Sequence, residues 1–513
     1  MIIHKSYKIK SCDDVELGLP RSSEKNPKLE FKLCWDDSRP VELLLVIIQG
    51  LGDDIFNPYL KLVMESLAKK HRAAILSPNY HNIGNRNQCG AKIDLDAFDM
   101  NLIEFFCKSN NISLPPDFRT SEYRRNAIFI LQDFIKKQKQ SGLCDSDFQL
   151  AVSATFFSAR GEYQNFGVMP ALDVLNALLW VQKNPPFKVE GGVESHEAEI
   201  PAVPPRVSSS SGAAASSSTA SCAVSKPSPQ NPRMSNSRTA NPSAKSLPVI
   251  AAGESYGGYL ASMCAKIAPW AVDGVINNSG GAKFIERMIG FGKEINYKMY
   301  PCTHHSFDHI LLSLFDKTYW TTNPHSPYFF SNARRKIRYI LEPRHLEIQA
   351  AYPKPIYVGY HSAKDYELPL KECVELYKIY QKLGFDATLH AVRYKKQIDG
   401  KFIKTLDHGL GIPFKALINK HLPEILEKLR RRHASPQNPR MSNSSPAENS
   451  PALAAARVSS RVSQARPAAK NSAANPPLLI PRSQNKSIAY PCDELLYTFS
   501  EKNHKMRLEI SRI

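Results

Sequence analysis

A serine flanked by glycines is the residue of this chain best suited to covalent chemistry. Ser255 lies in the segment Gly253-Glu254-Ser255-Tyr256-Gly257-Gly258. An apolar run typical of a buried strand precedes this segment, and apolar residues with helical spacing follow it. A G-x-S-x-G pattern between a strand and a helix is typical of a nucleophile elbow, where a sharp turn exposes the serine hydroxyl. We therefore predict that Ser255 is a catalytic nucleophile, and the alternative is an ordinary glycine-rich turn.

A serine hydroxyl is a poor nucleophile at neutral pH, so Ser255 needs a histidine base and a carboxylate that orients the histidine. With an elbow of this kind, the acid and then the histidine follow the serine along the chain. Asp365 follows a predicted strand, and His408 precedes Gly409 in the loop after the last predicted strand. We predict that Asp365 is the acid and His408 the base. Asp365 could instead cap a helix, Glu367 is the second choice of acid, and a lone histidine is often a surface residue.

Attack on a carbonyl also requires donors for the oxyanion that forms. These donors are commonly the amide after the nucleophile and an amide in the loop after an early strand. Here that loop is Gln49-Gly50-Leu51-Gly52, so we predict the backbone amides of Leu51 and Tyr256 as donors. Gln49 stands where many such loops carry histidine, which makes this motif a variant.

A polar loop after another predicted strand offers groups that can bind a substrate. Tyr80, His81 and Arg86 bring a hydroxyl, an imidazole and a guanidinium together within a few residues. Sites in parallel α/β sheets lie beyond the carboxyl ends of the strands. We predict that these three residues contact the substrate, and the alternative is ordinary hydrogen bonding within the loop.

The elements that must position these residues alternate between strands and helices. Strands are predicted at 6–9, 29–34, 43–48, 73–77, 248–252, 272–277, 355–360 and 387–393. Helices are predicted at 58–69, 169–183, 256–267, 368–383 and 414–430. This alternation predicts an α/β fold with one mostly parallel central sheet, antiparallel strands at its start and helices on both faces.

Two long excursions interrupt the alternation. The first, at about 94–141, carries predicted helices at 95–108 and 121–140, and the second runs from 278 to about 350 and is rich in aromatic residues. Both leave the sheet near the predicted catalytic face. We predict that they are cap elements that enclose the substrate, with simple outer packing as the alternative for any one aromatic residue.

Two low-complexity tracts, at 188–246 and 434–485, are rich in Ser, Ala, Pro and Asn. They contain too few large apolar residues to form a core, so we predict disordered inserts. The sequence of residues 228–237 is repeated at residues 435–444. A duplicated cassette explains this repeat better than a solenoid, which needs more stacked units with apolar faces, and a short binding motif is the alternative.

The inserts divide the predicted α/β domain into two parts. The first part covers 1–187 and the second covers 247–433, because the strand and helix alternation continues across the first insert. The last residues, 486–513, are predicted to form a β-hairpin with strands at 495–499 and 506–510.

The composition favours a cytoplasmic protein without a cofactor. Ten cysteines are scattered without C-x-x-C pairs or zinc-like spacing, which predicts reduced thiols and no metal site. The N-terminus turns polar at once, and no segment approaches the roughly 20 apolar residues that cross a bilayer. The net charge is +19, but without a zinc finger, a basic ribbon with aromatics or a phosphate-binding loop we predict no nucleic-acid partner. Attraction to an anionic substrate is the alternative, and the oligomeric state stays open.

Taken together, the motifs around Gly50, Ser255, Asp365 and His408 resemble those of α/β-hydrolases. The resemblance covers nearly everything outside the two inserts. It implies an α/β-hydrolase fold and a Ser-Asp-His triad. The elbow is also similar to that of prolyl-oligopeptidase-like serine peptidases, although those enzymes usually place a propeller before the hydrolase domain and here only about 40 residues precede the first core strand.

Three further segments, at 79–86, 268–275 and 326–335, resemble an uncharacterised family of hydrolase-like proteins from Campylobacter and Helicobacter relatives. Members of that family lie near flagellar glycosylation genes. The resemblance implies a link to surface-sugar acyl chemistry or motility but no established reaction. Inserts of this length are atypical for that family.

These observations predict a serine hydrolase that acts on a small-molecule or carbohydrate ester, such as an O-acyl or N-acyl derivative, through an acyl-enzyme. An acyltransferase would use the same triad with a different acceptor, and a peptidase is the next alternative. The non-enzyme alternative is a hydrolase-like scaffold whose flexible arms bind partners.

Overall fold

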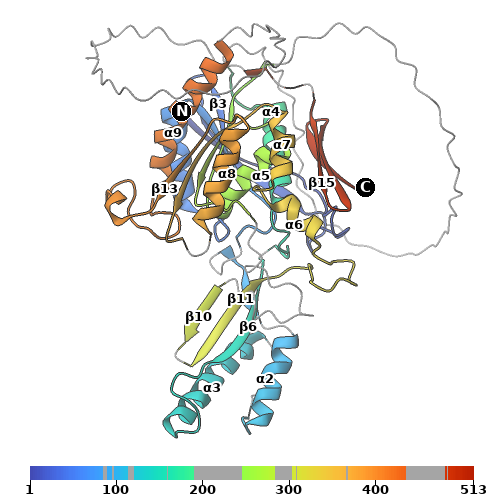
Figure 1. Cartoon of the computed structure of the whole chain (residues 1–513), viewed down its shortest axis with the longest axis vertical. Coiled ribbons are helices and arrows are strands. Elements are labelled where there is room, and N and C mark those ends of the chain that lie inside the picture. The colour runs from blue at the N-terminus through green and yellow to red at the C-terminus, as the bar shows by residue number, and fades with distance from the viewer. Residues whose placement is uncertain are drawn as a thin grey trace, which may run out of the picture.

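The computed structural model describes residues 1–84, 89–94, 97–113, 121–158, 160–189, 245–283, 303–307, 309–365, 368–434, 480–481, 483 and 485–513. Figure 1 shows a large body built around a twisted sheet, a smaller cap below it, and the C-terminal strands along one side of the body. Nearly all of both predicted inserts lies outside the described residues.

One eight-stranded sheet organises the body, in the order β1-β2-β4-β3-β8-β9-β12-β13. The strands are β1 (Ile2–Lys10), β2 (Lys28–Asp36), β3 (Leu43–Ile48), β4 (Ala73–Asn79), β8 (Val249–Glu254), β9 (Gly274–Asn278), β12 (Ile356–Ser362) and β13 (Ala387–Val392). β2 runs antiparallel to both of its neighbours, and the strands from β4 to β13 are parallel. All eight predicted strands are confirmed, as is the antiparallel start of the sheet.

The central strands are buried on both faces, which explains their continuous apolar sequences. In β3, Leu44 and Val46 belong to one hydrophobic core, whereas Leu43 and Leu45 belong to the core on the opposite face. Because side chains alternate along a strand, a single apolar run supplies both cores.

Helices cover the two faces of the sheet (Figure 1). α1 (Pro58–His71) and α9 (Phe414–Ala434) pack in one core, whereas α4 (Val168–Lys183), α5 (Tyr256–Ile267) and α8 (Leu370–Lys382) pack in the other. These five helices confirm the predicted ones. The structure adds α6 (Asn332–Arg338) and α7 (Pro343–Ala350), which the sequence did not predict.

The two excursions meet in one cap. The first supplies β5 (Lys92–Asp94), α2 (Ala97–Ser109), α3 (Ser121–Gln140) and β6 (Leu150–Phe157), and the second supplies β10 (Thr303–Phe307) and β11 (Ile310–Asp316). Their four strands form a sheet in the order β10-β11-β6-β5, in which β6 and β11 pair in parallel. The two helices were predicted, whereas the four strands were not; β10 and β11 pair as a local antiparallel hairpin, and β6 joins them from far away in the sequence.

The C-terminal residues form a three-stranded antiparallel sheet of β15 (Ser487–Cys492), β16 (Leu495–Lys502) and β17 (Lys505–Arg512). β16 and β17 are the predicted hairpin, and β15 is an additional strand. The hydroxyl of Tyr490 donates to the carbonyl of Lys266 at 2.6 Å, which ties this sheet to the end of α5. Two short strands, β7 (Lys245–Ser246) and β14 (Ile480–Pro481), pair with each other.

Candidate active site

Ser255 occupies the turn between β8 and α5 with φ +55° and ψ −125°. A positive φ is rare for a residue with a side chain and costs about 1–3 kcal/mol, so surrounding contacts must hold it. The amide of Ser255 donates to the carbonyl of Asn278 at 2.8 Å, and its own carbonyl accepts from the amide of Tyr259 at 3.1 Å. The local geometry is therefore that of the predicted nucleophile elbow.

Two glycines are required by close backbone approaches around this turn. A Cβ at Gly253 would lie 2.2 Å from the carbonyl carbon of Gly257, and a Cβ at Gly257 would lie 2.1 Å from the carbonyl oxygen of Ile48. Because those neighbours are backbone atoms, they cannot move aside as a side chain can. The glycine spacing of the motif thus permits the tight packing of β8, α5 and the end of β3.

The structure brings the three predicted catalytic side chains together. Nε2 of His408 lies 2.7 Å from Oγ of Ser255, and Nδ1 of His408 lies 2.8 Å from Oδ2 of Asp365. In the tautomer with its proton on Nδ1, His408 donates to the carboxylate and accepts from the serine. The imidazole is partly exposed, with 21% of its side-chain surface accessible, whereas the carboxylate is fully buried. Such an arrangement can remove the serine proton and return it to a leaving group.

Asp365 is held as a carboxylate by several donors. Burial alone would raise the pKa of Asp365, but the hydrogen bond to His408 and the backbone amide of Leu368 together lower it. That amide donates to Oδ1 at 3.0 Å. Leu368 precedes α8, whose N-cap is Pro369 without a side-chain cap bond, so Asp365 does not cap that helix as the alternative supposed. Glu367, the second choice of acid, lies outside the described residues.

A second histidine packs behind Asp365. Nε2 of His361 lies 2.8 Å from the carbonyl oxygen of Leu368 and 3.5 Å from Oδ2 of Asp365. Burial lowers the pKa of His361, which favours the neutral imidazole. A neutral imidazole at this position packs against the carboxylate of Asp365 without adding a positive charge that would compete with His408.

The end of β9 clamps the loop that carries His408. The side-chain amide of Asn278 donates to the carbonyl of Gly409 at 2.9 Å, and the amide of Gly409 donates to Oγ of Ser279 at 3.1 Å. Gly409 has φ +79°, a conformation that glycine adopts easily. The backbone amide and the carbonyl of Gly409 are therefore both fixed by the end of β9, next to the imidazole of His408.

The loop after β3 lies directly beside the nucleophile. A Cβ at Gly50 would lie 4.0 Å from Cβ of Ser255, and the hydroxyl of Tyr80 donates to the carbonyl of Gln49 at 2.8 Å. The amide of Tyr256 is in the first turn of α5, where backbone donors have no partner within the helix. Gly50 therefore lies close to the serine, and the amides of Leu51, the next residue, and Tyr256 stay the predicted oxyanion donors.

The predicted substrate-binding residues lie in different surroundings. Tyr80 is completely buried and supports the loop after β3 from behind. His81 is also buried, and its amide donates to the carboxylate of Asp173 at 2.8 Å. Arg86 lies outside the described residues. The contacts that the structure shows for Tyr80 and His81 are with the protein, and their contact with a substrate stays a prediction.

Buried ion pairs fix the loop that contains Tyr80 and His81. Arg21 lies 2.9 Å from Glu162 and 2.7 Å from Asp173, with all three side chains almost inaccessible to solvent. Arg160 contacts the same Glu162 and also donates to the carbonyl of Tyr80 at 2.9 Å. Burial would raise the pKa of Glu162, but the two guanidinium groups hold it well below its usual range.

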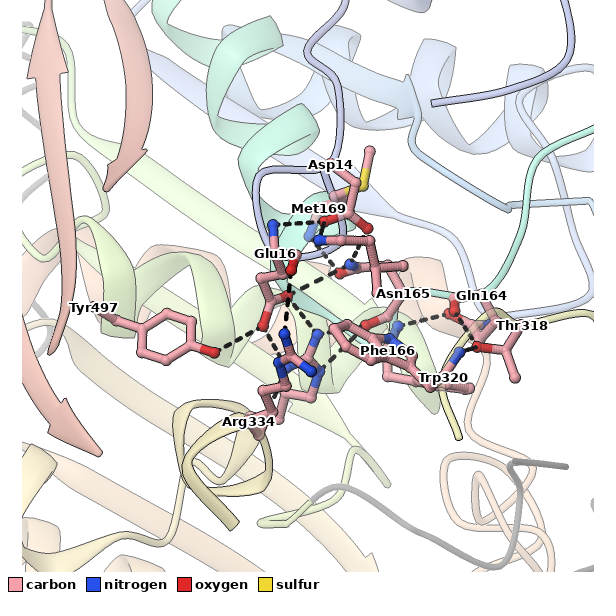
Figure 2. Close-up of polar contacts among 12 residues, drawn as sticks. Asp14, Glu16, Gln164, Asn165, Phe166, Met169, Thr318, Trp320, Arg334 and Tyr497 are labelled. Atoms are coloured by element: carbon pink, nitrogen blue, oxygen red, sulfur yellow. Dashed lines mark hydrogen bonds and ion pairs between the residues drawn. The ribbon is translucent and has the colours of Figure 1, made fainter. Parts of the chain in front are cut away.

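A second buried network surrounds Asn165 (Figure 2). Figure 2 shows the Tyr497 hydroxyl directed at the Glu16 carboxylate, with Asp14 and Asn165 alongside. Glu16 forms an ion pair with Arg338 at 2.5 Å, and Arg338 donates to the carbonyl of Asn165 at 2.8 Å. The network thus joins the N-terminal segment, α6 and the C-terminal sheet around the segment that precedes α4.

A further carboxyl group lies beside the loop of His408. A Cβ at Gly409 would lie 2.3 Å from Oε1 of Glu254, so the two residues are in close contact. Burial raises the pKa of Glu254; the charge of His408 opposes this shift and the charge of Asp53 adds to it. Glu254, the residue before the serine, therefore packs against the histidine loop.

The sequence did not predict roles for Asn278, Ser279, His361 or Glu254. His361 and Glu254 are close in sequence to Asp365 and Ser255, so the motifs themselves contained a signal for them. Asn278 and Ser279 carried no such signal, because their proximity to Gly409 depends on the neighbouring positions of β9 and β12 in the sheet.

The strand order, the antiparallel β2 and the serine turn after β8 define an α/β-hydrolase fold. The chain belongs to the family described as "Protein of unknown function (DUF2920)", whose model matches residues 5–193 and 234–450. A comparison with curated proteins finds no match.

Solved structures with the same general arrangement include Pyrococcus horikoshii acylaminoacyl peptidase, with 11% identity and a TM-score of 0.36. That match covers 84% of this chain and 42% of the peptidase, so the chain spans less than half of the peptidase's length. Brefeldin A esterase matches with 13% identity, a TM-score of 0.35 and coverage of 84% of this chain and 75% of the esterase. A Pyrococcus furiosus esterase matches with 9% identity, a TM-score of 0.36 and coverage of 83% and 90%. These activities are those of the matched proteins.

Among the described helices, none is both long enough and apolar enough to span a bilayer.

Proposed function

We propose that this protein is a serine hydrolase that cleaves an acyl bond through a covalent acyl-enzyme on Ser255. The observation that carries the proposal is the continuous hydrogen-bonded chain from Oγ of Ser255 through His408 to Asp365, at a serine held in a strained turn. Structural serines need neither the strain nor the imidazole at 2.7 Å.

In the proposed reaction, Oγ of Ser255 attacks the carbonyl carbon of the substrate while Nε2 of His408 takes the hydroxyl proton. The carbonyl π electrons move to the oxygen, and the amides of Leu51 and Tyr256 stabilise the resulting oxyanion. When the tetrahedral intermediate collapses, the bond to the leaving group breaks and His408 protonates that group. Water, activated by His408, then releases the acid and restores Ser255.

Asp365 acts in this scheme by fixing the tautomer and orientation of His408 and by stabilising the imidazolium that forms. Its bonds to Leu368 and His408 support this assignment. Because the carboxylate is fully enclosed, bulk water does not screen its charge from the imidazole.

For the substrate, we propose an O-acyl ester, or an N-acyl amide, of a carbohydrate or small metabolite as the preferred class. This choice, and a link to motility, rest on the resemblance to hydrolase-like proteins encoded near flagellar glycosylation genes. Transfer of the acyl group to an acceptor other than water would use the same first half-reaction.

The test is labelling of the purified full chain with a fluorophosphonate probe, followed by turnover of p-nitrophenyl acetate. We expect labelling of the wild type, no labelling of Ser255→Ala, and much slower labelling of His408→Ala and Asp365→Asn. The matched control is Ser262→Ala, which removes a buried hydroxyl further along α5 that donates to the carbonyl of Gly258.

Labelling that persists in Ser255→Ala, or that is absent from a folded wild type, would reject the proposal in favour of a non-catalytic scaffold. Labelling with p-nitrophenol turnover only when an alcohol or amine is added, and with the acetyl group recovered on that acceptor, would identify an acyltransferase. Cleavage of N-acyl peptides in preference to esters would identify a peptidase.

A further inference from the structure

A cavity lies at the junction between the cap and the body (Figure 1). It has a volume of about 340 Å³, and none of its lining residues belongs to the Ser255, Asp365 and His408 group. Small-molecule sites typically enclose roughly 300–1,000 Å³, so this cavity suits one small ligand.

Three segments that are distant in sequence form the cavity. They are 19–23 near the N-terminus, 157–163 after β6, and 317–319 after β11. The paired strands β6 and β11 both end at this point as they leave the cap for the body (Figure 1). Anything bound there would contact the two strand ends that join the cap to the body.

Hydrogen bonds fix the walls of the cavity. The amide of Gln164 donates to the carbonyl of Lys317 at 2.7 Å, and the hydroxyl of Thr318 donates to the carbonyl of Gln164 at 3.0 Å. The amide of Ser23 donates to the carbonyl of Gly161 at 3.4 Å, which closes the remaining side. The cavity is therefore a preformed feature of the described structure.

The groups that face the cavity favour an anion. Its one carboxylate, Glu162, is already neutralised by Arg21 and Arg160. The hydroxyls of Ser22 and Ser158 line the cavity and accept backbone amides at 3.1 Å and 3.4 Å, so each still has a proton that it can donate.

Lys317 supplies the positive charge. Its ammonium lies 5.5 Å from the ring centre of Phe157 and 5.2 Å from that of Tyr319, and no ion pair to a carboxylate of the described residues is present. Tyr163 stands edge-on to Tyr319 with ring centres 4.8 Å apart, so the aromatic surface continues deeper into the cavity. An ammonium above aromatic rings keeps its charge available for a ligand that also packs an apolar face on those rings.

We propose that this cavity binds a small hydroxylated organic anion of the size of one sugar acid. The carboxylate of the ligand pairs with Lys317, its hydroxyls meet Ser22 and Ser158, and its C–H face lies on Tyr319. The proposal does not depend on catalysis by Ser255.

The test is isothermal titration calorimetry of the full chain with D-glucuronate as the probe, compared with D-glucose and inorganic phosphate. Glucuronate is expected to bind saturably. Glucose lacks the charge and phosphate lacks the apolar face, so each is expected to bind at least about tenfold more weakly. Lys317→Gln is expected to weaken glucuronate binding by about tenfold or more while the Tm stays the same.

Two control variants distinguish binding in this cavity from binding elsewhere on the protein. Lys396→Gln removes another lysine that lies over a tyrosine ring, that of Tyr394, and is expected to leave binding unchanged. Ser255→Ala is also expected to bind glucuronate as the wild type does. The proposal fails if the wild type shows no saturable binding, if Lys317→Gln binds normally, or if Ser255→Ala abolishes binding.

Discussion

Asp365 and Glu16 are both buried carboxylates that contact residues distant in the sequence, but the chemical groups of these partners differ. Asp365 lies 2.8 Å from the imidazole of His408, whereas Glu16 lies 2.5 Å from the guanidinium of Arg338. A guanidinium keeps its proton under all ordinary conditions, and an imidazole exchanges its proton near neutral pH. The network around Glu16 is therefore suited to fixing structure, and the group around Asp365 is suited to moving a proton.

The surroundings of the two carboxylates support the same distinction. Glu16 and Arg338 are both fully enclosed, and their network includes further bonds to Tyr497 and the Asn165 carbonyl. His408 keeps part of its ring exposed and contacts Ser255. Variants of the two groups should consequently separate activity from stability.

The largest expected effect is on activity, from Asp365→Asn. The amide keeps the shape of the side chain but favours the wrong tautomer of His408, so kcat for p-nitrophenyl acetate is expected to fall by about 10⁴-fold with little change in the Tm. The matched control is Asp407→Asn, at an exposed carboxylate adjacent to His408, which is expected to keep normal kcat. An equal loss in both variants would show that Asp365 is not the orienting acid.

The next effect is on stability, from Arg338→Met. Removal of the guanidinium leaves the buried charge of Glu16 without its ionic partner, which is expected to cost about 3–5 kcal/mol of unfolding free energy. Urea unfolding measures this loss. Arg344→Met, at an exposed ion pair with Glu347, is the control and is expected to cost less than about 1 kcal/mol.

A smaller effect on activity is expected from Arg338→Met in the fraction that stays folded. Fluorophosphonate labelling of that fraction at low urea should proceed at the wild-type rate within a few-fold. Complete loss of labelling in folded protein would show that the two networks are coupled and would break the comparison.

The pH dependence of stability extends the comparison to a third buried carboxylate, Glu162, which is also paired with guanidinium groups. Because Arg21 and Arg160 hold the pKa of Glu162 below its ordinary value of 4.5, the unfolded chain binds the proton more readily than the folded chain. The stabilising contribution of Glu162 is thus fully present above pH 4.5 and is lost as the pH falls through the folded pKa. Urea unfolding of the wild type and Glu162→Gln from pH 7 to pH 3.5 should show a constant difference that shrinks only below about pH 4.5. A difference that already shrinks between about pH 7 and pH 6 would contradict this assignment.

The sequence was informative where a local pattern determines the structure. The strand, turn and helix around Ser255 lie within one short segment, and the order of Asp365 and His408 after it follows from the strand sequence of the body. The eight strands of the large sheet were predictable because burial on both faces makes the central ones continuous apolar runs.

The remainder depends on contacts that no local pattern records. β6 and β11 pair in parallel across the cap although they are far apart in the sequence, so neither segment alone indicates its partner. Glu16 and Arg338 look like ordinary solvated charges in the sequence, because their ion pair forms only when the N-terminal segment and α6 meet. The clamp on Gly409 likewise requires the end of β9 to lie beside the histidine loop.

The last expected effect concerns that clamp, through Ser279→Ala. The substitution removes the oxygen that accepts the amide of Gly409 at 3.1 Å, so the loop of His408 gains freedom without any change in charge. We expect kcat to fall by about tenfold and stability by about 1 kcal/mol, the usual range for one buried hydrogen bond.

The double variant of Ser279→Ala with Asp365→Asn decides how the clamp acts. If the hydroxyl works only by positioning His408 for the carboxylate, its loss should matter less once Asp365 is replaced, and the two effects on kcat should not add. Ser326→Ala, at a loop serine whose hydroxyl accepts the amide of Tyr328, is the control and should change neither kcat nor the double-variant result. Fully additive losses would mean that Ser279 supports the fold around the site rather than the alignment of the imidazole.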